Sequence, residues 1–122
     1  MGDNGEVFRE AWIEGVRKHY PGEPKPGYVA PWEETPQWEQ KSAAAVYEQV
    51  RAFLGATGGR AARLTREQKG QFVAVCWAAQ IHQHFDDPRP SYVAGWEGLP
   101  PWQRETDADI FERIEKEPFR PG

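Results

Sequence analysis

Apolar residues along the 122-residue chain follow a helical spacing almost throughout. They recur every three or four positions in four separate segments, whereas the strict alternation that is typical of half-buried strands is nearly absent. This pattern predicts helices over about residues 5–19, 36–54, 66–85 and 101–117. The third segment is apolar on almost every side between Phe72 and Ala79, so we expect that helix to be the central one.

Residues that begin or end helices stand at the edges of these segments. Thr35 is expected to cap the second helix, with Pro36 in its first turn, where a missing N–H costs nothing. Thr65 and Gln68 have the spacing of a capping box at the start of the third helix. Pro118 is expected to end the fourth helix, because proline cannot continue it.

One sequence motif occurs twice in the chain. YVAPWEETPQW begins at Tyr28, and YVAGWEGLPPW begins at Tyr92. With an offset of 64, residues 28–50 and 92–114 share nine identities in 23 positions, and upstream an offset of 65 pairs further residues. Because rare tryptophans and prolines match in register, the repeated motif indicates an internal duplication.

The duplication predicts an all-α single domain, residues 1–122, built from two tandem units. The units are residues 5–54 and 65–117, with a linker at 55–64 and a tail at 118–122. Each unit consists of a helix, an extended proline-rich crossing and a second helix, which makes four main helices. A helical hairpin cannot bury its own apolar face, so we expect the units to pack about an approximate internal two-fold axis.

The motifs of the second unit resemble those of a known family. LPPWQRETD, residues 99–107, resembles the Leu-Pro-x(6)-Asp signature of the ryanodine-receptor repeat (RyR) domain, and the crossings at 26–32 and 90–96 are similar to the segment that precedes it. Residues 32–43 are similar to a stretch of small bacterial and phage relatives. The first helix of each unit keeps the family's tryptophan and lacks its histidine. Over most of residues 5–117 the resemblance implies a binding or interaction role, with nucleotide-derived small ligands, and no catalytic residues.

Composition and charge narrow the function classes. A net charge of −4 and a pI of about 5.4 argue against binding to a nucleic-acid polymer, which usually needs a basic face. No apolar run approaches the roughly 18 residues of a membrane span, and no signal-peptide pattern opens the chain. Cys76 is the only cysteine, which fits a reducing compartment and a place in the core. A cytoplasmic protein without a membrane partner is therefore expected.

Aromatic residues at matched positions are the first candidate site. One interpretation is that they lock the crossings onto the helices. The other is an aromatic cleft between the units, in which tryptophan and tyrosine faces stack on a planar ligand. Trp96 is the first candidate for an open face, because Gly95 and Gly98 flank it. The aromatic candidates are Trp32, Trp38, Trp96, Trp102, Tyr28 and Tyr92.

Glycines and arginines before the third helix are the second candidate site. Free amides and the helix dipole at a helix start favour an anion, so Arg60, Arg63 and Arg66 could hold a phosphate or carboxylate there. The segment lacks the Gly-Lys-(Ser/Thr) ending of a P-loop. The alternative is a flexible linker with solvated arginines.

No catalytic, metal-binding or cofactor-binding constellation emerges from the sequence. His82 and His84 lie about 200° apart around a helix and diverge, and no nucleophile or base accompanies the matched glutamates of the repeat. His19, which matches His84, is expected to interact with free carbonyls at a helix end. For Asp107 and Asp109 we expect solvent exposure or a favourable place in the helix dipole.

These patterns predict a non-enzymatic binding module for a small anionic or aromatic ligand, which the family resemblance suggests is nucleotide-derived. The alternative is a helical protein–protein interaction module that works as a homodimer or with a partner protein.

Overall fold

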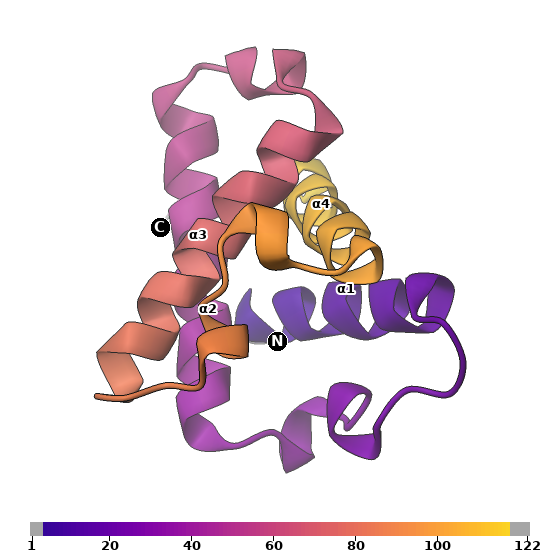
Figure 1. The fold of residues 1–122 in the computed structure, drawn as a ribbon. Coiled ribbons are helices and arrows are strands. Elements are labelled where there is room, and N and C mark those ends of the chain that lie inside the picture. Colours follow the sequence, from indigo (N-terminus) through magenta and orange to yellow (C-terminus); the bar gives the residue numbers. More distant parts are fainter. Residues whose placement is uncertain (1–3, 118–122) are drawn as a thin grey trace.

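The computed structural model describes residues 4–117, which form four α-helices (Figure 1). These are α1 (Asn4–His19), α2 (Gln37–Ala56), α3 (Arg66–His84) and α4 (Pro101–Lys116). No strand occurs in the described range, so the predicted all-α architecture with four main helices is confirmed. The predicted tail, with the stop at Pro118, lies outside the described residues.

Short 3-10 helices form the connections. Two of them, η1 (Pro26–Tyr28) and η2 (Trp32–Glu34), join α1 to α2, and two more, η4 (Pro90–Tyr92) and η5 (Trp96–Gly98), join α3 to α4. A fifth, η3 (Arg60–Arg63), joins the two hairpins. The crossings also agree in backbone angles, since φ and ψ are −120° and 15° at Val29 and −122° and 20° at Val93.

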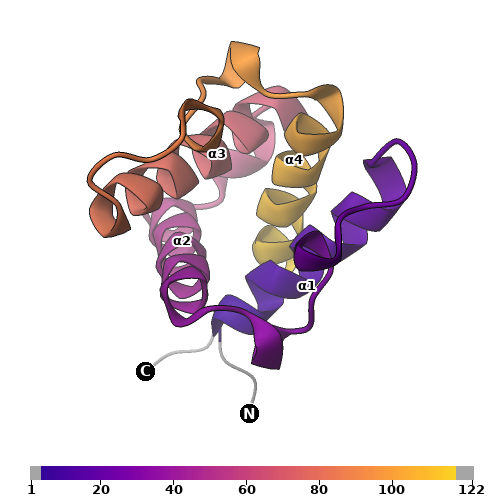
Figure 2. The same ribbon diagram turned by 60° about the horizontal axis from the view of Figure 1, so that its bottom comes forward.

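Helix α4 makes the most extensive contacts with the other helices. It packs along α1 on one side and α3 on the other, while α2 packs on α1 and α3 (Figure 2). Ile110, Phe111 and Ile114 on α4 are completely buried, and burying each such side chain stabilises the fold by about 1.5–3 kcal/mol. The prediction that the third helix is central is wrong. Val75, in the middle of its apolar stretch, is 70% exposed, because the outer side of α3 has no helix against it.

One of the two predicted caps is present. The Gln68 N–H donates to Thr65 Oγ1 at 3.1 Å and the Thr65 N–H donates to Gln68 Oε1 at 2.9 Å, so the capping box is confirmed. Thr35 does not cap α2. Its hydroxyl donates to the Pro31 carbonyl at 3.1 Å, which closes the turn of η2. Pro36 therefore takes the N-cap position and lies before the first helical turn, not in it.

Each hairpin closes around a glycine and a tryptophan. A Cβ atom on Gly5 would lie 2.7 Å from Cη2 of Trp32, and a Cβ atom on Gly70 would lie 2.7 Å from Cη2 of Trp96. Real Cβ atoms do not approach other atoms so closely. Glycine is therefore required at both positions for the tryptophan to lie against its own hairpin's first helix.

The other matched tryptophans join the two hairpins. Trp102 of α4 lies against Tyr20 at the end of α1, with ring centroids 4.9 Å apart, and Trp38 of α2 lies against Phe85 at the end of α3, also at 4.9 Å. Each hairpin thus places a tryptophan on the other. These matched contacts support the predicted two-fold relation, which stays a prediction until residues 28–50 are superposed on 92–114.

Candidate functional site

The aromatic candidates do not converge on one cleft. Trp32, Trp38 and Trp102 pack against glycine or other rings within the fold. Tyr28 packs among three other rings, whereas Tyr92 is 53% exposed and makes no ring contact with another described residue. For these three tryptophans and for Tyr28, the observed role is the first of the two interpretations, which is to lock crossings and helices together.

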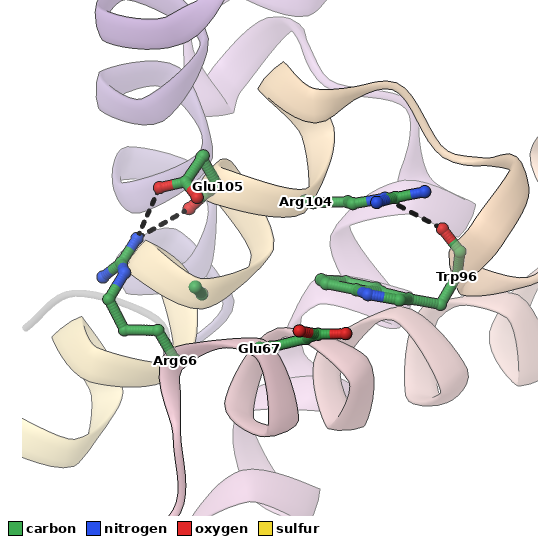
Figure 3. Close-up of a pocket in the computed structure, with 6 residues that line it drawn as sticks. Arg66, Glu67, Trp96, Arg104 and Glu105 are labelled. Carbon is green, nitrogen blue, oxygen red and sulfur yellow. Dashed lines mark hydrogen bonds and ion pairs between the residues drawn. The ribbon is translucent and has the colours of Figure 1, made fainter.

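Trp96 borders a pocket. The pocket has a volume of about 190 Å³ and lies where the first turn of α3 meets η5 and the start of α4 (Figure 3). In Figure 3 the indole of Trp96 lies between the side chains of Arg104 and Glu67. The residues that line the pocket are Arg66, Glu67, Trp96, Arg104, Glu105 and Ala108.

Arg104 binds the backbone beside Trp96 and covers its ring. Its Nε donates to the Trp96 carbonyl at 3.0 Å, and its Nη2 donates to the Glu97 carbonyl at 2.9 Å. The guanidinium carbon lies 5.6 Å from the centroid of the indole, within the range of a cation–π contact. At the matched position Gln40 donates to the Trp32 carbonyl at 2.7 Å. Arg104 therefore binds the tryptophan carbonyl of its hairpin as Gln40 does in the first hairpin. It also brings a positive charge, which Gln40 lacks.

Arg66 reaches the same pocket from the first turn of α3. Its Nη2 lies 3.1 Å from Glu105 Oε2 and 2.9 Å from Asp109 Oδ1, and its Nη1 pairs with Glu112. Burial alone would lower the pKa of Arg66, but the bonds and charges of these carboxylates outweigh it and raise the pKa. Arg66 is therefore a fixed positive charge at the edge of the pocket.

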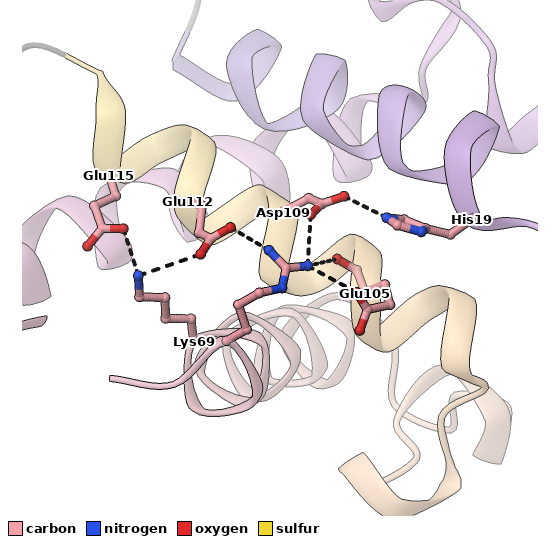
Figure 4. A network of polar contacts seen from close by, with 7 residues as sticks. His19, Lys69, Glu105, Asp109, Glu112 and Glu115 are labelled. Atoms are coloured by element: carbon pink, nitrogen blue, oxygen red, sulfur yellow. Dashed lines mark hydrogen bonds and ion pairs between the residues drawn. The ribbon is translucent and has the colours of Figure 1, made fainter. Parts of the chain in front are cut away.

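The ion pairs continue along α4 (Figure 4). Asp109 Oδ2 lies 2.8 Å from Nε2 of His19, and Lys69 Nζ lies 2.9 Å from Oε1 of Glu115. The expectation of a solvated Asp109 is wrong, because it joins α4 to both α1 and α3. His19 likewise meets this carboxylate and not a free carbonyl. A shallow hollow of about 570 Å³ beside this network has Ala11 and Gly15 at its lining and charges of both signs around it.

Asp107 is buried, which corrects the expectation that it faces solvent. Burial raises its pKa well above the ordinary value of 3.8. Its side chain forms no hydrogen bond or ion pair with another described residue. The matched position in the first hairpin is Ala43, which is also buried. Because α4 packs on α1, α2 and α3, its buried face includes Asp107, a position at which the sequence pattern predicts a polar surface.

The other candidate arginines lie apart from the tryptophans. Arg60 and Arg63 belong to η3 and are exposed, and neither pairs with a carboxylate among the described residues. The segment 55–64, for which a flexible linker was one alternative, turns at Gly58 and Gly59, which adopt left-handed angles. It is anchored by Ala61, which is buried in the core. Of the three arginines proposed from sequence, Arg66 is the one that lines the pocket of Trp96.

Sequence reasoning missed Arg104, Glu67, Glu105 and Ala108 as pocket residues. For Arg104 a signal was present, because the duplication pairs it with Gln40 and so marks a charge that the first unit lacks. The other three line the pocket only because α3 and α4 cross there.

Within residues 4–117 no group of three or more His, Cys, Asp or Glu side chains is placed to hold a metal ion. In the same range, no helix combines the length and the apolar character that crossing a membrane requires. Cys76 is half-buried beside the core, and burial raises the pKa of its thiol.

Comparison with protein-family models, with curated proteins and with solved structures found no match to this chain. The resemblance to the RyR domain therefore stays a prediction from short motifs.

Proposed function

We propose that this protein is a non-enzymatic binding module, and that the Trp96 pocket holds the anionic group of a small ligand. The observation that supports this most directly is that Trp96, Arg66 and Arg104 line one pocket. Guanidinium groups bind carboxylates and phosphates through paired N–H donors.

Both arginines have binding capacity left. Arg104 donates through Nε and Nη2 to carbonyls, and no bond from its Nη1 to a described residue is present. Arg66 is held by Glu105, whose side chain is 55% exposed, and exposed ion pairs of this kind contribute only about 0–1 kcal/mol. An incoming anion would take the place of the Glu105 carboxylate, while Asp109 and Glu112 keep Arg66 in position.

The size of the pocket limits what it encloses. Sites that surround a whole drug-sized ligand have volumes of about 300–1,000 Å³, and this one has about 190 Å³. It fits one carboxylate or phosphate group, with the rest of the ligand lying across the surface. The family resemblance adds nucleotide-derived ligands to the chemistry that is worth testing.

Titration of tryptophan fluorescence and of the melting temperature with nucleoside monophosphates, cyclic dinucleotides and dicarboxylates tests the proposal. The decisive variant is Arg104→Gln, which copies Gln40 and keeps the carbonyl bond. It should weaken binding by tenfold or more while leaving the fold intact. Gln40→Ala in the first hairpin is the matched control and should leave affinity unchanged. Saturable binding that Arg104→Gln does not weaken would place the site elsewhere, and no response to any ligand would contradict the proposal.

A second candidate function is protein–protein interaction, as a homodimer or with a partner protein. It is favoured by the exposed apolar side chains of the second hairpin, where Val75 is 70%, Tyr92 53% and Phe85 39% exposed. The residue that matches Val75 is Glu10, so a charge is compatible with the fold at this place. If copies associate here, light scattering should show a dimer that Val75→Glu converts to a monomer. A wild-type monomer at high concentration would argue against the homodimer.

A further inference from the structure

The two crossings have the same backbone but differ in their side-chain anchors. Tyr28 and Tyr92 each donate an N–H bond of 2.9 Å to the carbonyl three residues earlier, and Val29 and Val93 each donate one of 3.2 Å to a proline carbonyl. The local turns are therefore equivalent, and any difference in how firmly the crossings are held comes from the contacts around them.

The first crossing is tied to α1 by two side chains. Arg9 Nη2 donates to the Gly27 carbonyl at 2.9 Å and to the Ala30 carbonyl at 2.8 Å, and Nε of the same residue donates to Ala30 at 3.1 Å. Trp12 Nε1 donates to the Tyr28 carbonyl at 2.9 Å. Arg9 is buried in this position, with Glu39 as its ionic partner at 3.7 Å. These bonds join the middle of the crossing to the first helix.

The second crossing lacks each of these ties. Ala74 takes the place of Arg9, and Trp77, the counterpart of Trp12, donates no hydrogen bond to a described residue. The ring of Tyr92 has no ring partner among the described residues, whereas that of Tyr28 has three. Gly95 replaces Pro31, which leaves the end of the crossing free to rotate.

The ends of the second crossing are nevertheless held. Phe85 packs on Trp38 at 4.9 Å where α3 ends, and Arg104 binds the Trp96 and Glu97 carbonyls beyond Gly95. A segment with few contacts between two fixed points opens locally at a lower free energy than the fold as a whole.

We propose that residues 86–95 form a releasable strap, which opens as a unit while the first crossing and the helical core stay closed. The hinge at its far end is Gly95, directly before Trp96. Release changes the surface beside the Trp96 pocket without unfolding the domain. The strap is a property of the fold and does not depend on which ligand the pocket takes.

Amide hydrogen exchange measured by NMR on the whole chain tests the strap. Val29 and Val93 both follow a tyrosine and both donate to a proline carbonyl at 3.2 Å, so their unprotected exchange rates are the same. Val93 should exchange at least tenfold faster than Val29, which corresponds to about 1.4 kcal/mol. The amide of Phe111 in α4 reports opening of the core and should exchange far more slowly than both. Equal rates at Val29 and Val93, within about twofold, would overturn the proposal.

Variants that exchange the anchors complete the test. Arg9→Ala should raise the exchange rate of Val29 toward that of Val93 and leave Val93 unchanged. Ala74→Arg supplies the missing anchor and should slow Val93. Gly95→Pro should slow Val93 in a second way, by making the hinge rigid. Proline fits there, because φ of Gly95 is −67° and an added Cβ would meet no atom within 4 Å. Slower exchange at Val93 in either variant supports the strap, and unchanged exchange in both refutes it.

Discussion

Asp107→Asn removes a charge from the inner face of α4 and keeps the shape of the side chain. The residue is 5% exposed and has no hydrogen bond or ion pair with another described residue. Burial raises its pKa well above 3.8. For each pH unit over which the unfolded chain has released this proton and the folded chain retains it, stability falls by about 1.4 kcal/mol.

The sign follows from which state loses the proton first. As the pH rises above about 3.8, Asp107 ionises in the unfolded chain while the folded chain keeps it protonated. The folded state then binds more protons, so the free energy of unfolding declines with pH. The decline ends where the folded carboxyl itself ionises. Below pH 3.8 both states are protonated, and this residue contributes no pH dependence.

Urea unfolding of the wild type and the variant between pH 4 and pH 7 measures the effect. The variant's advantage in unfolding free energy should be smallest near pH 4 and grow toward pH 7, by on the order of 1 kcal/mol for each pH unit over which only the unfolded chain is ionised. Asp109→Asn is the control on the same helix. It breaks the partly exposed pairs with His19 and Arg66 and should lower stability by about 1 kcal/mol. A difference between wild type and Asp107→Asn that does not change with pH would refute the reasoning.

Three further predictions concern stability and are measured by the same urea unfolding. Gly70→Ala should destabilise by about 1–3 kcal/mol, because its Cβ would lie 2.7 Å from the Trp96 ring, whereas Gly55→Ala, in open space within α2, should stabilise by up to about 1 kcal/mol. An equal effect of the two would contradict the close approach. Phe111→Ala should cost about 3–5 kcal/mol, because the side chain is completely buried, and a loss below 1 kcal/mol would mean that α4 is not the centre of the core. Thr65→Ala should cost about 0.5–2 kcal/mol through loss of the capping box, and no loss would show that α3 begins without it.

Local features were predictable because they depend on residues close together in the sequence. The helical spacing placed α1 at about 5–19 against the observed Asn4–His19, and the Thr65 capping box uses residues three apart. Thr35 failed as a cap because its hydroxyl donates to the Pro31 carbonyl in the turn of η2. The residue at the N-cap of α2 is Pro36, whose side chain cannot accept a bond from a helix N–H. The 3-10 helices were missed because proline-rich segments carry no apolar periodicity.

The candidate site was only partly predictable, because part of it depends on contacts between segments far apart in the sequence. Trp96 was marked by the duplication and by its flanking glycines, and Arg66 by its place at a helix start. That these two share a pocket with Arg104 depends on how α3 crosses α4. Arg60 and Arg63 satisfied the same sequence criteria as Arg66 and yet lie apart, because η3 directs them to the surface.

The sequence by itself determined four helices, their proline-rich crossings and the internal correspondence between residues 64 or 65 apart, because spacing, capping and turn residues act over a few neighbours. The tertiary structure alone decided that α4 packs most extensively on the other helices, that Asp107 is buried and that Trp96 borders a pocket with Arg66 and Arg104. Each of these depends on contacts between distant segments, where one helix face can meet any of several partners with similar apolar surface.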